Sequence, residues 1–219
     1  AYARRIIALN DEAAVSVGAT AAAASVRMGL PQDFFEDVMP DALDRFSQAR
    51  PGVHVEVRAG RNHVLEAEVQ AGRIDVAVAF FPEGSDGHGT LVASLPMVWL
   101  APQAAPDVAA ATPLPLILFD HPCLFRQGAL KALDRAGHRW RLALTTPSLP
   151  GVWAALRLGH GVTVRTRHRV PPGALEVAPS AGLPELPRIE LRLLTAGNLP
   201  PAAADLREIV EDAARRRLA

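Results

Sequence analysis

The stretch that decides the fold is Ser25–Ala79, SVRMGLPQDFFEDVMPDALDRFSQARPGVHVEVRAGRNHVLEAEVQAGRIDVAVA. Short alternating or mostly apolar runs predict strands here, and apolar residues that recur every three to four positions predict helices between them. The resulting order is strand, helix, strand, helix, strand, which is typical of a parallel α/β sheet. The strands are expected over 25–30, 53–58 and 74–79, and the helices from Asp33 to a stop at Pro51 and from about Asn62 to Ala71.

The first helix of this stretch carries a break in its own pattern. Asp33 is expected to be its N-cap, with Glu36 three residues later as the acidic form of a capping box. Pro40 follows inside the apolar pattern, and proline lacks the N–H group that a helix interior needs. We therefore expect the helix either to kink at Pro40 or to begin a new first turn there.

The same pattern returns in the second half of the chain, after an alanine- and proline-rich connector (101–113). Strand, helix, strand, helix and strand are expected again, over 114–120, 124–136, 140–145, 149–158 and 162–164. A further strand (189–194) and a closing helix (202–217) follow. Because the second unit is already complete, we expect the closing helix to return to the first unit.

Two such units predict an α/β chain with two lobes, each a βαβαβ-based sheet flanked by helices. A return to the first lobe requires two crossovers of the chain, which we expect near Leu100 and Leu194. The expected division is the end of a helix and a joint (1–22), a first lobe (23–99 and 195–219) and a second lobe (100–194). The cleft between two lobes is a common place for a small ligand.

Composition argues against several other classes of protein. Lysine plus arginine equals aspartate plus glutamate at 23 each, so the chain offers nucleic acid no general electrostatic attraction. No apolar run reaches the ~18 residues of a membrane span. The single Cys123 cannot form an intrachain disulfide, which fits a reducing cytoplasm. No secretory signal is visible at the start of the chain. The chain opens with Ala1 rather than methionine and begins in the middle of a predicted helix, so we expect upstream sequence to be missing.

The expected ligand site lies beyond the carboxyl ends of the strands, where ligands of parallel α/β sheets bind. Four predicted helices begin there, and the free N–H groups of helix starts favour an anion. The residues expected to bind the ligand are Pro31, Gln32, Asp33, Arg61, Asn62, Phe80, Cys123, Phe125, Thr146, Ser148, Thr163 and Arg165. Arg167 is a further source of positive charge. Asp33, Asn62 and Ser148 are explained equally well as helix caps.

Metal and catalytic sites have little support in the sequence. His160 and His168 are the closest pair among the seven histidines, and no spacing typical of a metal site occurs. Asp120, His121 and Cys123 share one predicted turn, but no nucleophile elbow, P-loop or dinucleotide fingerprint accompanies them. We therefore expect no metal, no cofactor and no enzymatic activity.

An ordered set of segments resembles the effector-binding region of LysR-type transcriptional regulators over nearly the whole chain. The segments are YARRIIALNDEA (2–13), the run from Ser25 to Gly60, AGRIDVAVA (71–79) and RLALTTPSLPGVWAALRLGHGVTVRT (141–166). The resemblance implies a two-lobed, type 2 periplasmic-binding-protein-like fold that works in the cytoplasm as the sensor of a small-molecule effector.

The resemblance also implies features beyond this chain. A winged helix-turn-helix would precede Ala1 and would be the only part to bind DNA, and residues 1–17 would be the last turns of the linker helix after it. Members of the family act as homodimers or homotetramers, so Phe34 is expected at a subunit interface. The alternative is a solute-binding protein of a transport system, which the same fold would serve.

Overall fold

The computed structural model describes residues 25–86 and 88–218. The predicted end of a linker helix (1–22) lies outside the described residues. In chain order the elements are β1 (Ser25–Leu30), η1 (Gln32–Phe34), α2 (Val38–Ala49), β2 (His54–Ala59), α3 (Asn62–Gln70), β3 (Val76–Pro82), β4 (Thr90–Pro102), η2 (Pro106–Ala110), β5 (Leu114–Phe119), α4 (Leu124–Arg135), β6 (Trp140–Thr146), α5 (Leu149–Arg157), β7 (Thr163–Thr166), β8 (Ala174–Glu176), η3 (Pro179–Ala181), β9 (Arg188–Thr195) and α6 (Pro201–Leu218). None of the helices just named has the length and apolar character needed to span a membrane.

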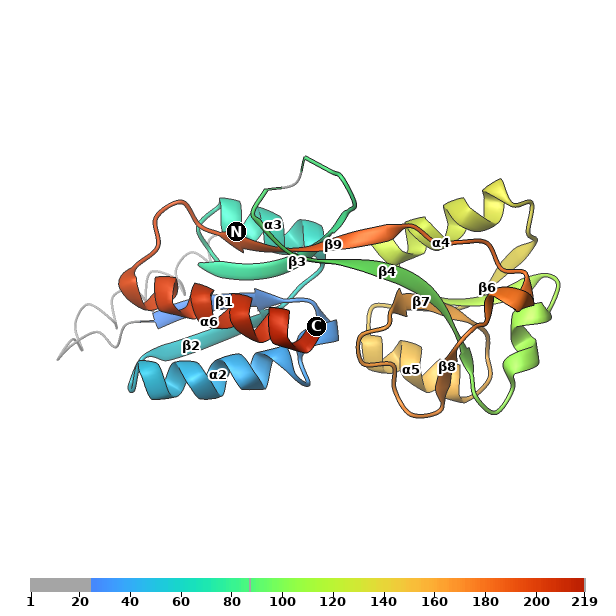
Figure 1. The fold of residues 1–219 in the computed structure, drawn as a ribbon, viewed down its shortest axis with the longest axis horizontal. Helices are drawn as coiled ribbons and strands as arrows, with labels where there is room; N and C mark the ends of the chain where they lie inside the picture. Colours follow the sequence, from blue (N-terminus) through green and yellow to red (C-terminus); the bar gives the residue numbers. More distant parts are fainter. Residues whose placement is uncertain (1–24, 87, 219) are drawn as a thin grey trace, which may run out of the picture.

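The first lobe is built on three parallel strands in the order β2-β1-β3. Side chains alternate between the two faces of the sheet. On β3, Val76 and Val78 join the core under α2 and α6, whereas Ala77 and Ala79 pack with Leu65 of α3. The C-terminal helix α6 lies beside α2 and contacts β1, so the end of the chain returns to the first lobe (Figure 1).

The second lobe has its own small parallel sheet. β5 pairs with β6, and Leu116 forms a bridge with Val162 directly before β7. Ile117 packs with Val152 and Leu156 of α5 in a core that also takes residues from β4. The helix α4 contacts β5 and β7. The lobe therefore repeats the strand–helix alternation of the first lobe, as predicted.

Two strands join the lobes (Figure 1). β4 pairs with β9 as far as Pro96 and with β7 from Met97, so the hydrogen-bonded order β2-β1-β3-β9-β4-β7 runs through both lobes. β9 pairs with β3 along nearly its whole length. β4 thus changes its partner at Met97, close to the crossover predicted near Leu100, and β9 already pairs with β3 at Ile189, before the crossover predicted near Leu194. The predicted limits of the lobes remain a prediction.

The first helix of the first lobe begins later than predicted. α2 starts at Val38, and its N-cap is Asp37, whose Oδ1 accepts a hydrogen bond from the Val38 N–H at 2.6 Å. Asp33 lies instead in the 3₁₀ turn η1, which has no side-chain cap. Pro40 lies in the first turn of α2, where its missing N–H removes no helical hydrogen bond. The prediction of Asp33 as N-cap is therefore wrong. Of the two outcomes expected at Pro40, a kink or a new first turn, the structure has the new first turn.

Phe34 belongs to the core rather than to a surface. Its side chain is fully buried, with its ring centroid 5.5 Å from that of Phe80 and 5.3 Å from that of His168. His168 follows β7, so the contact joins η1 of the first lobe to the second lobe. The expected place of Phe34 at a subunit interface is therefore wrong.

Candidate functional site

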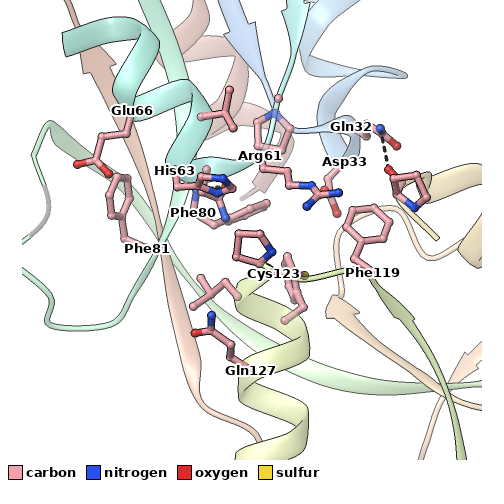
Figure 2. A pocket seen from close by; sticks show the side chains of 18 of the residues that line it. Gln32, Asp33, Arg61, His63, Glu66, Phe80, Phe81, Phe119, Cys123 and Gln127 are labelled. Carbon is pink, nitrogen blue, oxygen red and sulfur yellow. Dashed lines mark hydrogen bonds between the residues drawn. The ribbon is translucent and has the colours of Figure 1, made fainter. Parts of the chain in front are cut away.

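A cavity of about 630 Å³ lies between the two lobes (Figure 2). The first-lobe wall comes from the carboxyl ends of β1, β2 and β3 and from the start of α3, as parallel-sheet topology predicts. The second-lobe wall comes mainly from the segment between β5 and α4 and from the first turn of α4. The lining residues are Pro31, Gln32, Asp33, Ala59, Gly60, Arg61, Asn62, His63, Val64, Glu66, Phe80, Phe81, Pro82, Phe119, Pro122, Cys123, Leu124, Phe125, Gln127, Pro147 and Arg165.

Nine of the twelve residues predicted to bind a ligand line this cavity: Pro31, Gln32, Asp33, Arg61, Asn62, Phe80, Cys123, Phe125 and Arg165. Thr146, Ser148 and Thr163 do not line it. Arg167 does not line it either, because its largely exposed guanidinium pairs with Glu176 at 2.7 Å. The cavity therefore collects most of the predicted set from segments that are far apart in the chain.

Ser148 and Thr146 organise the start of α5. Ser148 is the N-cap, and its Oγ accepts a hydrogen bond from the Gly151 N–H at 3.3 Å. Thr146 Oγ1 accepts from the Ser148 N–H at 3.2 Å. Thr163 is buried within β7. For Ser148, the geometry thus supports the alternative that it is a helix cap.

Asn62 lines the cavity but does not cap α3. The N-cap position belongs to Arg61, whose side chain makes no capping hydrogen bond. Asn62 Oδ1 accepts instead from the Phe80 N–H at 3.0 Å. This bond ties the start of α3 to the end of β3, so Asn62 holds two parts of the first-lobe wall together.

Gln32 reaches from the first lobe to the start of α5. Its Oε1 accepts a hydrogen bond from the Leu149 N–H at 2.7 Å, and its Nε2 donates to the Pro147 carbonyl at 3.5 Å (Figure 2). The N–H groups at the start of α5 are therefore taken by Gln32 and Ser148. This helix start is not the free anion site that we predicted.

Arg61 spans the cavity mouth. Its Nη2 donates to Asp120 Oδ1 at 2.5 Å, and its Nη1 donates to the His121 carbonyl at 3.3 Å. Arg61 belongs to the first lobe and Asp120 to the second. The Arg61 guanidinium lowers the pKa of Asp120 first through the hydrogen bond, with burial acting in the opposite direction and the charge of Arg61 adding to the lowering. The pair is one of the ionic links between the lobes.

Arg165 is the buried cation of the cavity. Its side chain is only 4% exposed, and its guanidinium carbon lies 4.1 Å from the ring centroid of Phe119 and 4.7 Å from that of Phe125. The nearest carboxylate oxygen is Asp33 Oδ1, at 3.7 Å. Aromatic faces stabilise a desolvated cation. The rings therefore hold the guanidinium in place without using its N–H donors.

Sequence reasoning missed several residues of the interlobe region. Glu66 and Gln127 line the cavity, and Phe119 does so at the end of β5. Phe119 had a usable signal, because it ends a strand at the edge where ligands bind. Arg169 pairs with Glu36 of the other lobe at 2.6 Å, and no pattern in the chain relates residues 133 positions apart.

Comparison with known proteins agrees with this arrangement. A family model described as LysR substrate binding domain matches residues 19–215. The chain is 32% identical over 194 residues to the HTH-type transcriptional regulator DgdR of Burkholderia cepacia, a match that covers 88% of this chain and 65% of that protein. This chain therefore corresponds to less than two thirds of the length of that relative.

Solved structures show the same fold. The C-terminal domain of a probable LysR family transcriptional regulator from Rhodococcus sp. RHA1 has a TM-score of 0.67 at 19% identity, over 86% of this chain and 98% of that one. The effector binding domain of QuiR in complex with shikimate has a TM-score of 0.66 at 9% identity, over 88% of this chain and 98% of that one. The two-lobed, periplasmic-binding-protein-like fold is shared, and since the family model covers most of the chain, this protein belongs to the LysR substrate-binding-domain family.

Proposed function

We propose that this chain is the effector-sensing domain of a DNA-binding transcriptional regulator and that it binds a small polar or anionic molecule between its lobes. The observation that carries the proposal is the cavity of about 630 Å³, whose walls come from both lobes and which contains the buried Arg165. A volume in this range is typical of small-molecule sites. The relatives lend support, since DgdR is named as a transcriptional regulator and the QuiR domain was solved with shikimate.

Two other functions, a solute-binding protein of a transport system and an enzyme, have no support of this kind. The relatives named above are described as transcriptional regulators, and these descriptions name neither a transport protein nor an enzyme. A regulatory domain needs only to bind, and nine of the predicted ligand-binding residues already line one cavity. The nine residues are therefore proposed as contacts of an effector and not as catalytic groups.

The proposed mechanism is a shift between lobe arrangements. A ligand in this cavity touches first-lobe residues such as Arg61 and second-lobe residues such as Arg165, so its contacts depend on how the lobes are placed. A ligand shifts such an equilibrium only as far as its affinities for the two arrangements differ. The change in lobe placement would then alter how subunits pack and how far apart their DNA-reading parts lie.

The remaining parts of the proposal concern the whole protein. We propose a cytoplasmic homodimer or homotetramer that binds DNA only through an N-terminal winged helix-turn-helix of the longer protein. The helix-turn-helix in the name of DgdR supports this, as does the equal number of acidic and basic residues in the present chain. The 219-residue chain alone should not bind operator DNA in a salt-sensitive manner.

The test uses the full-length protein, its operator DNA and a panel of metabolites. A compound that alters operator binding should lose potency by at least about tenfold in the Arg165→Gln variant, since a buried charged contact is removed. Arg167→Gln is the matched control, because Arg167 is two residues away, exposed and outside the cavity. Equal potency in the two variants would contradict binding at this site.

A further inference from the structure

Arg165 and Asp33 are two largely buried charges that lie beside each other in the cavity wall as a loose ion pair, and neither side chain is hydrogen-bonded within the described residues. The side chain of Arg165 is 4% exposed and that of Asp33 is 10% exposed, and both line the cavity. Their closest approach is 3.7 Å, which is longer than the ~2.8 Å of a charge-assisted hydrogen bond. Within the described part of the chain, neither side chain forms a hydrogen bond with any other group.

This arrangement differs from that of the other charged cavity residues. Arg61 is hydrogen-bonded to Asp120 and to the His121 carbonyl, and Glu66 faces the His88 ring at 3.3 Å. Among the described charged residues that line the cavity, Arg165 and Asp33 alone form no hydrogen bond through their side chains. A buried guanidinium with five N–H donors and a buried carboxylate are both costly unless they are hydrogen-bonded.

The two groups select a ligand that carries one charge of each sign. A plain carboxylate would satisfy Arg165 but would leave Asp33 unpaired next to a second negative charge, which is unfavourable where water is excluded. A plain amine would satisfy Asp33 and leave Arg165 unpaired. A zwitterion satisfies both and keeps the site neutral, and the short distance between the two protein groups suits charges attached to neighbouring atoms.

The rest of the cavity selects an apolar body for the ligand. Phe80, Phe81, Phe119, Phe125 and Leu124 contribute to the walls. Phe80 and Phe125 pack edge to face with their ring centroids 5.4 Å apart. Burial of apolar ligand surface against such rings stabilises the complex.

From these features we infer that the effector is an α-amino acid with an apolar side chain. Its carboxylate accepts hydrogen bonds from Arg165 of the second lobe, its ammonium group donates to Asp33 of the first lobe, and its side chain lies among the phenylalanine rings. The inference rests on the proposed function and adds the chemical class of the effector. A ligand held in this way bridges the lobes through its two charged groups.

The experiment measures binding to the 219-residue chain by calorimetry and by the shift in melting temperature. The probes are phenylalanine, leucine, isoleucine, valine and methionine, each with two matched analogues: the carboxylic acid that lacks the amino group and the amine that lacks the carboxyl group. We expect at least one amino acid to bind and both of its analogues to bind at least about tenfold more weakly. An equal or tighter affinity for the matched carboxylic acid, or no binding by any of the five amino acids, would overturn the inference.

Two variants locate the binding. Asp33→Asn replaces the carboxylate by an amide of the same size, so it should weaken binding of the amino acid at least about tenfold while the matched carboxylic acid binds as well as before or better. Arg165→Gln should weaken both compounds, and Arg167→Gln should weaken neither. Because Asp33→Asn keeps the shape of the side chain, it remains informative if Arg165→Gln does not fold.

The two proposals fail in different ways. A carboxylic acid that binds through Arg165 and is insensitive to Asp33→Asn would refute the amino-acid class and leave the interlobe effector site in place. An amino acid that binds both Arg165→Gln and Asp33→Asn as tightly as it binds the wild type would refute both proposals, because its site would then lie elsewhere.

Discussion

Asp37 Oδ2 lies 2.9 Å from His168 Nε2, and this contact joins the two lobes. Both side chains are more than nine-tenths buried, and the approach is close without the alignment of a hydrogen bond. Asp37 is the N-cap of α2 in the first lobe, whereas His168 follows β7 in the second. Glu36 and Arg169 form an ion pair next to them, so the start of α2 and the segment after β7 form a polar junction between the lobes.

The Asp37–His168 contact should appear as energetic coupling between the two residues. Asp37→Asn keeps a capping oxygen, so its main effect is on the contact with His168. We expect Asp37→Asn and His168→Gln each to lower the free energy of unfolding by about 1–3 kcal/mol, with the double variant less destabilised than the sum by at least about 0.5 kcal/mol. Urea denaturation measures the free energy of unfolding of the two single variants and of the double variant. If the losses of the single variants simply add in the double variant, the contact contributes nothing to stability.

The Arg61–Asp120 link should give a dependence on acid pH. The pKa of Asp120 is lowered in the folded protein, mainly by its hydrogen bond with Arg61. A carboxyl group with a lowered folded pKa adds stability above its unfolded pKa of about 4, and this contribution is lost as the pH falls through the folded pKa. Wild type should therefore lose more stability than Asp120→Asn when the pH is lowered from 5 to below about 3.5.

The urea midpoint followed across this pH range measures the effect. Asp107→Asn is the control, because Asp107 is exposed and has no ion pair within the described residues. It should follow the wild-type curve. If Asp120→Asn also follows that curve, the link does not contribute to stability at neutral pH.

Ser148→Ala should affect stability and not ligand binding. The hydroxyl caps α5 and lies outside the cavity, so its loss should lower the free energy of unfolding by about 1 kcal/mol. Calorimetric titration with an effector should give the wild-type affinity. Ser47→Ala is the control for the loss of a hydroxyl, since Ser47 is exposed on α2. Weaker binding with unchanged stability would instead make Ser148 a ligand contact, as the sequence alone allows.

Gly161 and Gly137 should respond differently to alanine. Both have positive φ angles, 156° and 68°, which alanine adopts with difficulty. A Cβ at Gly161 would lie 2.4 Å from the Pro115 carbonyl oxygen, whereas a Cβ at Gly137 would have open space. We expect Gly137→Ala to cost about 1 kcal/mol and Gly161→Ala at least about twice as much. If thermal unfolding shows an equal loss of stability for the two variants, the β5 backbone at Pro115 must be able to move away from the added Cβ.

Much of the fold could be predicted from local patterns, because the strands and α-helices of both lobes are marked by apolar runs or by their own periodicity. The start of α2 could not. Asp33 with Glu36 resembles a capping box, but Phe34 is buried against Phe80 and His168, and the helix begins only after Asp37. Packing between residues that are distant in the chain decided that boundary.

The site shows the same division between local and distant information. Strand ends predicted where the cavity lies, since the rule for parallel sheets depends only on strand direction. The roles of individual side chains depended on partners elsewhere in the chain. Gln32 occupies the start of α5, Asn62 binds the Phe80 backbone, and Arg165 lies over two aromatic rings.

The most direct measurement is a crystal structure of this chain with the compound that most raises its melting temperature in a metabolite screen. We predict that the compound lies in the interlobe cavity, with one of its oxygen atoms within about 3.2 Å of the Arg165 guanidinium and with contacts to both lobes. A compound bound to one lobe alone, or in the adjoining cavity of about 740 Å³ between α4 and residues 184–189 and away from Arg165, would contradict the proposed effector site.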